Sequence, residues 1–383
     1  GQAESWEVSE DGLTWTFHLR EGLKWSDGSA LTANDFVYSW KRVCDPMTAA
    51  PYAETVLGMV DGYAEAIEGN TDALNVVAAD DLTLVVTLSN PCSYFGSLAA
   101  FATLSPVQQA TIEANGDAWA VDPATWVSNG SFYVTEWVPG SHIMMSKNPN
   151  YWNVDAIKLD KIKFNLMEDP NAAYSAYQTG EVLLIKDVPT EEIPSFEGNA
   201  EFHVEPIIGT YYLSLNTAKA PFDNALVRKA FSLAIDREYV ANTIMQGTYS
   251  PAYNFMGPGW MDAAGTQFMD NANNGELYIS EDYEANLEEA KRLLTEAGYP
   301  NGEGLPAITY STNDSGYHKP VAEYLQQAWA ELGVDVTVEV VEWASFTPMR
   351  RNGEYMAARN GWVGDYSDPS NMLELLYSTN GNN

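Results

Sequence analysis

The side chains that most often carry out catalysis are sparse in this sequence and are not arranged for it. The four histidines lie far apart, and the two cysteines form neither a C-x-x-C pair nor a cluster with histidine. No G-x-S-x-G elbow, H-E-x-x-H helix or G-x-G-x-x-G turn is present. A carboxylate pair for glycoside hydrolysis has no specificity as a signal here, because acidic residues are abundant. The sequence favours a binding protein over an enzyme, with no cofactor and no metal site.

One carboxylate, Asp365, stands where it can bind a cation. It follows the short apolar segment 361–364 (GWVG) and precedes Ser367-Asp368-Pro369. A carboxylate on a glycine-flanked strand edge can meet the ammonium group of a ligand while the neighbouring backbone pairs with an extended ligand. The alternative is that Asp365 caps a helix starting near Pro369, a role that Asp368 or Ser367 would fill better.

Aromatic residues form a second group with binding potential. They lie near predicted strand ends or loops in the second half of the chain, where open α/β sheets bind ligands: Tyr211, Tyr212, Trp343, Trp362 and Tyr366. For any one of them, packing in the core is the commoner role.

The first part of the chain predicts a strand-rich region. Residues 11–25 and 82–88 alternate in the manner of strands, and residues 132–151 predict a hairpin that turns at Pro139-Gly140. Thr32 is a suitable N-cap, with Asp35 three residues later, for a helix over Asp35–Arg42.

The second part predicts alternating helices and strands. A helix over Glu281–Ala297 ends at Gly298, a strand covers Ala307–Tyr310, and a helix covers Val321–Leu332. A further strand follows, with Val334, Val336, Val338 and Val340 on one face. This order indicates an open α/β sheet.

Length and charge restrict the class of protein further. A chain of 383 residues is expected to form two or more lobes. The 19 Lys and Arg against 53 Asp and Glu give a net charge of -34, which repels nucleic-acid phosphates, so no nucleic-acid partner is expected. No apolar run reaches about 18 residues, the minimum for a membrane span. Cys44 and Cys92 are either an exported-protein disulfide or two unrelated buried thiols.

Several segments resemble the family 5 solute-binding proteins of oligopeptide, dipeptide and nickel ABC importers, and the resemblance runs the length of the chain. They are LKWSDG at 23–28, DFVYSWKR at 35–42, KNPNYW at 147–152, PFD at 221–223 and LAIDR at 233–237. Residues 361–369 (GWVGDYSDP) are similar to the peptide-binding subgroups rather than to the nickel binders.

The resemblance implies an α/β fold with two lobes, of the class II periplasmic-binding-protein type, that closes on its ligand by a hinge. Residues 1–109 would form a strand-rich accessory domain, 110–207 part of the first lobe and 208–383 the second lobe. Both ends, including Asn382-Asn383, look like cuts, so the fold is expected to be truncated at both ends.

The resemblance also implies a set of site residues. Asp365 would hold the α-ammonium group of a peptide, and the backbone of Gly361 and Val363 would pair with the peptide as an added strand. Tyr52 and Tyr212 match ligand-lining tyrosines, and Trp343 and Trp362 match pocket aromatics. Arg350, Arg359 and His318 match cationic groups that meet a peptide C-terminus, whereas Ser214 replaces an acidic residue of some relatives. Gly209 and Val363 replace a cysteine pair of some relatives, so a disulfide between Cys44 and Cys92 would be a different one.

The function implied is capture of short peptides by an extracytoplasmic protein, in the periplasm or lipid-anchored on the outer face of the cytoplasmic membrane. We expect a monomer that delivers its ligand to the membrane permease subunits of an ABC importer. Two alternatives stay open: the same fold binding an oligosaccharide or another small solute, and a secreted glycoside hydrolase.

Overall fold

The computed structural model describes residues 1–314 and 316–378, so the predicted cut at Asn382-Asn383 lies outside the described residues. The chain divides into two compact units, with the boundary between Glu168 and Asp169. The domain limits predicted after residues 109 and 207 stay predictions. Within the described residues, no helix has both the length and the apolar character needed to cross a membrane.

Unit 1 is built on two antiparallel sheets. The larger has the strand order β1-β2-β4-β3, and the smaller has the order β5-β6-β7. Its strands are β1 (Ala3–Val8), β2 (Thr14–Leu19), β3 (Val76–Asp80), β4 (Thr83–Thr87), β5 (Phe132–Val138), β6 (His142–Lys147) and β7 (Lys161–Asn165). Its α-helices are α1 (Ala33–Cys44), α2 (Ala53–Leu57), α3 (Tyr63–Ile67), α4 (Phe95–Leu98) and α5 (Gln109–Asn115).

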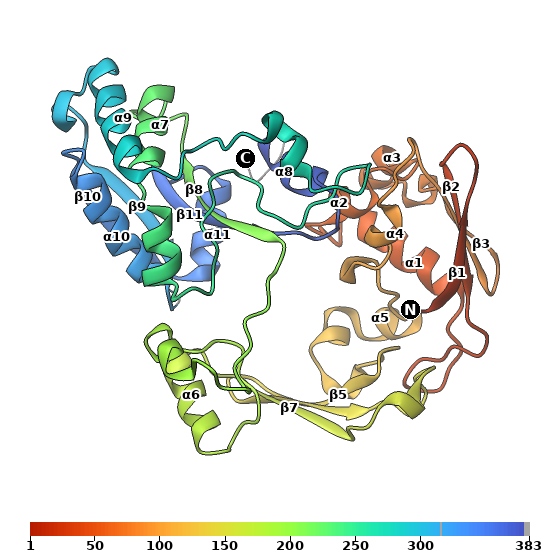
Figure 1. Ribbon diagram of the computed structural model, residues 1–383. Helices are drawn as coiled ribbons and strands as arrows, with labels where there is room; N and C mark the ends of the chain where they lie inside the picture. The colour runs from red at the N-terminus through yellow and green to blue at the C-terminus, as the bar shows by residue number, and fades with distance from the viewer. Residues whose placement is uncertain (315, 379–383) are drawn as a thin grey trace. The chain divides into compact units, whose positions relative to one another are not determined.

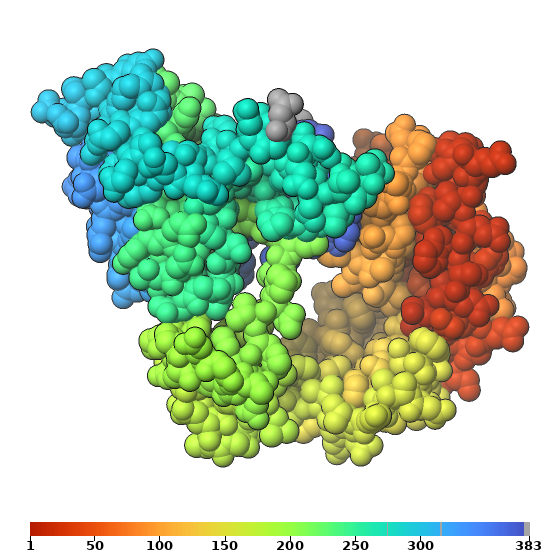
Figure 2. All heavy atoms as spheres, viewed as in Figure 1, coloured from red at the N-terminus to blue at the C-terminus, as the bar shows by residue number. Residues whose placement is uncertain are grey.

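The alternation of apolar and polar residues in the sequence correctly predicts which residues of β2 lie in the core of unit 1. Trp15, Phe17 and Leu19 of β2 are buried, and Trp15 packs edge-on against Phe95 at 5.4 Å between ring centroids. Helix α1 begins directly after Thr32, whose N–H donates to the Asp35 carboxylate over 2.7 Å, as the capping pattern predicts. β1 is an edge strand at the surface of unit 1, drawn in red in Figure 2.

Unit 2 contains the predicted α/β sheet, with the strand order β10-β9-β11-β8. β10, β9 and β11 run parallel, and β8 pairs antiparallel with β11. Its strands are β8 (Gly209–Leu215), β9 (Ile308–Asn313), β10 (Val336–Val341) and β11 (Ala357–Val363). Its α-helices are α6 (Pro170–Gln178), α7 (Ala225–Leu233), α8 (Phe268–Asn271), α9 (Tyr283–Glu296), α10 (His318–Ala330), α11 (Trp343–Arg351) and α12 (Ser370–Leu373).

The core of unit 2 joins helices to this sheet through large aromatic side chains. Trp329 of α10 is fully buried and lies 5.0 Å from the ring of Phe231 on α7 and 6.0 Å from that of Tyr310 on β9. Helices α7 and α9 pack side by side (Figure 1). The sheet edge described below is therefore carried by a well-packed unit.

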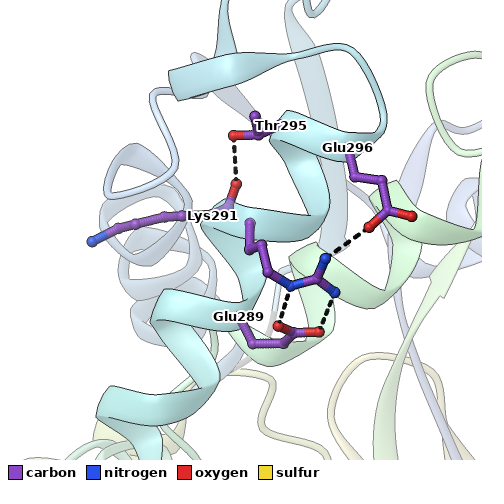
Figure 3. Close-up of polar contacts among 5 residues, drawn as sticks. Glu289, Lys291, Thr295 and Glu296 are labelled. Atoms are coloured by element: carbon purple, nitrogen blue, oxygen red, sulfur yellow. Dashed lines mark hydrogen bonds and ion pairs between the residues drawn. The ribbon is translucent and has the colours of Figure 1, made fainter.

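Helix α9 shows why the predicted helix over Glu281–Ala297 is stable. Its N-cap, Asp282, accepts the N–H of Ala285, and Gly298 follows the C-cap with a positive φ of 93°. On the exposed face, Arg292 pairs with Glu289 one turn before it and Glu296 one turn after it (Figure 3).

The disulfide that the sequence left open does not form. Cys44, the last residue of α1, and Cys92, in the segment before α4, are present as two buried thiols. Burial raises the pKa of the Cys44 thiol to about 11, so the thiol stays protonated and unreactive. Of the two alternatives, the structure supports two buried thiols over a disulfide.

Candidate ligand-binding site

Strand β11 has an open edge on the side away from β8. β8 pairs with β11 over the full length from Ala357 to Val363. On the other side, β9 pairs only with Ala357 and Ala358. From Arg359 onward, this side of β11 has no strand partner among the described residues. An open edge of this kind presents unpaired backbone donors and acceptors to an added strand.

One hydrogen bond just beyond the end of β11 shows which of its backbone groups face the open edge. The N–H of Gly364 donates to the carbonyl oxygen of Ile208 at 2.8 Å, which continues the pairing with β8. In an antiparallel pair, every second residue exchanges such bonds with the partner strand. Gly364 is one of these residues, so the backbone N–H and C=O groups of Gly361 and Val363 point away from β8. In agreement, the N–H of Gly361 donates to Oδ1 of Asn360 at 2.8 Å. The two residues expected to pair with a peptide thus have their backbone groups at the open edge.

Asp365 lies two residues beyond the end of β11 and is half-buried. Its N–H donates to Oδ1 of Asn371 at 2.9 Å, and its Oδ2 atom is buried. The N–H of Ser370 at the start of α12 is accepted by Asp368 at 2.9 Å. Asp368 therefore accepts the amide at the start of α12, the role for which the sequence offered Asp365 as an alternative.

Arg350 is held by neutral partners at the other end of the edge. Its guanidinium donates to Oδ1 of the buried Asn360, and Nδ2 of Asn360 donates to the hydroxyl of Ser214 at 2.9 Å. Burial, together with the nearby Arg359, lowers the pKa of Arg350. The position at which some relatives have an acid is occupied by Ser214, so this network contains no carboxylate.

Arg359 is surrounded by aromatic rings and a histidine. Its guanidinium carbon lies 5.5 Å from the ring centre of Tyr211 and 5.8 Å from that of Trp343. The imidazole of His318 lies 5.6 Å from the same Tyr211 ring. The Nε atom of Arg359 is buried and has no hydrogen-bond partner in the described part of the chain.

Among the described residues, no acid forms an ion pair with Arg350 or Arg359. The ion pairs between described residues involve His18, Lys41, His142, Lys291 and Arg292. Two guanidinium groups that are close enough to interact and lack a carboxylate create a positive region in a protein of net charge -34. Such a region favours an anionic group on a ligand, since an unpaired buried charge is costly.

His318 gives the site a predictable response to pH. It is the first residue of α10 and only 3% exposed, and its Nδ1 atom has no hydrogen-bond partner among the described residues. Burial, and secondarily the charge of Arg359, lower its pKa from 6.5 to about 4. Between these values the unfolded chain binds a proton that the folded chain does not. The free energy of unfolding should therefore fall as the pH falls from about 6.5 to about 4.

We expect a His318→Gln variant to lose this part of the pH dependence. Melting temperatures of the natural protein and the variant, measured from pH 7.5 to 4, should converge as the pH falls, because the variant has no imidazole to charge. His18→Gln, which changes a partly exposed histidine of unit 1, is the matched control. If the melting temperatures of the natural protein and His318→Gln fell in parallel as the pH was lowered, the pH dependence could not be assigned to His318.

The remaining predicted residues are placed as follows. Tyr212 lies in β8 and packs on Phe255 at 5.1 Å, whereas Tyr52 lies in unit 1 beside Phe101 at 5.2 Å. Trp343 is the first residue of α11, shortly after β10 ends at Val341, and Trp362 is the last residue but one of β11, so both lie near strand ends as predicted. Tyr211 and Tyr212, predicted near strand ends or loops, are the third and fourth residues of β8. Both are in the middle of β8, because that strand extends on both sides of them to pair with β11.

Three comparisons complete the description of the site. The family model described as "Bacterial extracellular solute-binding proteins, family 5 Middle" matches residues 1–383. The chain belongs to family 5 of the bacterial extracellular solute-binding proteins. Within the family, it is 36% identical over 397 residues to the periplasmic oligopeptide-binding protein OppA of Salmonella typhimurium, covering all of this chain and 70% of the relative.

Two further family 5 proteins show the range of ligands named for relatives. The probable deoxycholate-binding periplasmic protein YgiS of Escherichia coli is 34% identical, over 98% of this chain and 69% of the relative. The solved structure of Haemophilus influenzae OppA in complex with RPPGFSPFR superposes with a TM-score of 0.84 at 34% identity. The match covers all of this chain and 75% of that one. The mixed α/β architecture of this family 5 chain is thus the one of periplasmic binding proteins.

Proposed function

We propose that this chain is the extracytoplasmic peptide-binding component of an ABC importer. The observation that carries the proposal is the open edge of β11, which lies between the carboxylate of Asp365 at one end and the guanidinium groups of Arg359 and Arg350 at the other. A short peptide has the same three features: a backbone that can pair, an ammonium group and a carboxylate.

The polarity of the site sets the direction of the ligand. With its ammonium group at Asp365 and its carboxylate toward Arg359, the peptide runs antiparallel to β11. The six residue steps from Arg359 to Asp365 span about 20 Å in extended chain. That span suits peptides of about three to six residues.

The two kinds of interaction divide affinity and selectivity between them. Main-chain pairing at Gly361 and Val363 supplies affinity without reading side chains. The charged ends select for free termini, because a desolvated ammonium or carboxylate group is costly unless it meets an opposite charge. Tyr212, Trp343 and Trp362 would line the side-chain positions.

The rest of the proposal follows from the family. The protein binds and releases its ligand without chemical change, acts as a monomer, and presents the loaded form to the membrane permease subunits. Residues 1–109, 110–207 and 208–383 would correspond to an accessory domain and parts of two lobes, and a lipid anchor would hold the protein at the outer face of the membrane. Tyr52 of unit 1 would be a further ligand contact.

Calorimetry with a mixed pool of tri- to pentapeptides tests this function. The pool should bind, and the same pool with acetylated N-termini should bind at least tenfold more weakly, because acetylation removes the ammonium group. Equal binding of both pools would remove the role of Asp365. Binding of neither pool, with binding of an oligosaccharide or a bile acid such as deoxycholate, would replace the peptide by another solute. Turnover of a chromogenic glycoside would instead indicate a hydrolase.

The arginines give a separate prediction. Arg359→Gln should weaken binding of a free peptide by about tenfold, the scale of one charge-assisted hydrogen bond, and should have little effect on the same peptide with an amidated C-terminus. Arg292→Gln, which removes an exposed arginine from α9, is the matched control and should leave both affinities unchanged. An equal loss for the free and the amidated peptide would show that Arg359 does not meet the C-terminus.

A further inference from the structure

One side chain, Asn371, joins two groups that the proposed function uses separately. Its Oδ1 atom accepts the indole N–H of Trp362 at 3.0 Å and the backbone N–H of Asp365 at 2.9 Å. Asn371 itself lies in α12 and is completely buried. A single buried oxygen atom therefore connects the end of the open edge, the aromatic ring beside it and the backbone that carries the carboxylate.

We infer that Asn371 is a positioning residue of the ligand site, an inference that rests on the proposed function. It sets the rotamer of Trp362 and the path of the backbone at Asp365, so that an aromatic surface and a carboxylate are presented together to the N-terminal residue of a peptide. A loop end can hold a charged group in place only if its own backbone donors are fixed.

A second restraint acts on the same segment. The N–H of Gly364 is bound to Ile208, and a Cβ atom at Gly364 would lie 2.4 Å from the Cη2 atom of the buried Trp260. Between Trp362 and Asp365, the chain is thus held at Gly364 by β8 and by the Trp260 ring. Asn371 holds the two ends of this segment, through the Trp362 indole and the Asp365 N–H. The Asn371 contact is made to the backbone of Asp365 itself.

The acceptor atom of Asn371 is the part that matters. Its Nδ2 atom has no hydrogen-bond partner in the part of the chain that the structure describes. Asn371→Asp therefore keeps an oxygen acceptor for both hydrogen bonds and gives up no donated one, and burial beside Asp365 favours the neutral, protonated carboxyl at this position. Asn371→Leu has a similar shape but leaves the N–H groups of Trp362 and Asp365 without their acceptor. The two variants separate positioning from packing.

Calorimetry with a free tripeptide, such as trialanine, compares these variants in the full chain at pH 7. We expect Asn371→Leu to bind at least tenfold more weakly than the natural protein, and Asn371→Asp to stay within about threefold. Asn286→Leu removes another buried amide of unit 2, one that donates to Ser280, and is the control for loss of a buried polar group. It should lower the melting temperature without changing the affinity.

Hydrogen exchange provides a readout that needs no ligand. In labelled protein without peptide, the amide of Asp365 and the indole N–H of Trp362 should exchange faster in Asn371→Leu than in Asn371→Asp. If Asn371→Leu does not fold, Trp362→Phe takes its place: it keeps a ring but loses the indole bond, and it should weaken peptide binding severalfold while leaving the melting temperature within a few degrees.

The outcomes separate this inference from the proposed function. Peptide binding by the natural protein with equal affinity in Asn371→Leu would overturn the positioning role and leave the function intact. Absence of peptide binding by the natural protein would overturn the function. The positioning of Asp365 would then be decided by the exchange rates alone, and equal rates in the two Asn371 variants would overturn it.

Discussion

Replacing Asp365 by alanine should weaken the binding of a free short peptide by about thirtyfold or more. The expected loss of binding free energy is at least about 2 kcal/mol. This is the scale observed when a buried charge, here the α-ammonium group of the ligand, loses its partner. Oδ2 of Asp365 is buried, and the helix after it is capped by Asp368. The substitution therefore removes a ligand contact and does not remove the cap of α12.

The specificity of this effect is what tests the role of Asp365. Binding of an N-acetylated peptide is expected to be weak in the natural protein, and Asp365→Ala should change it by less than about threefold. Asp368→Asn neutralises a neighbouring carboxylate and keeps a capping side chain, so it controls for a general loss of negative charge. Calorimetry of both peptides with both variants gives the result. A free peptide that binds Asp365→Ala as well as it binds the natural protein would withdraw the proposed ammonium site.

Replacing Trp329 by alanine should lower the free energy of unfolding of unit 2 by about 4 kcal/mol. Removal of a fully buried tryptophan leaves a large cavity between α7, α10 and β9, and losses of about 3–5 kcal/mol are usual for such changes. The indole N–H also donates to the buried carbonyl oxygen of Phe231 at 2.9 Å, and the substitution leaves that oxygen without its donor.

Urea denaturation followed by circular dichroism measures this loss. Trp329→Phe keeps most of the ring and loses the hydrogen bond, so it should fall between the natural protein and Trp329→Ala. Trp343→Ala removes a tryptophan that is 51% exposed and should cost less than about 1 kcal/mol. Comparable losses for Trp329→Ala and Trp343→Ala would mean that Trp329 is not central to the core.

The sequence predicts best the parts of this protein that depend on local patterns. Alternating burial identifies β2, and the Thr32–Asp35 pair locates the start of α1. The burial of the alternating valines near β10 declines along the chain, from Val336, which is 3% exposed, to Val340, which is 49% exposed. The periodicity predicts which face of the strand is buried, but not how far the helix that covers this face extends along the strand.

The candidate site is predicted less completely, because it depends on contacts between distant segments. Asp365 is proposed from its neighbours in the sequence, and Gly361 and Val363 from the family resemblance. Asn360 and Asn371 could not be proposed in either way, since a single amide carries no periodic signal and its role depends on partners such as Ser214, which is 146 positions away from Asn360. The cysteines show the same limit, because whether two thiols meet is decided by the fold.

The open edge of β11, proposed above to pair with peptides, is also a hazard for the protein itself. A strand edge that pairs with any backbone can also pair with the same edge of another molecule, which is a route to aggregation. The bond from the Gly361 N–H to Asn360 satisfies one donor of this edge within the chain. A peptide that replaces this bond loses little affinity, because its charged ends contribute interactions that the β11 edge of another molecule does not make. The same bond therefore disfavours pairing of this edge with the edge of another molecule.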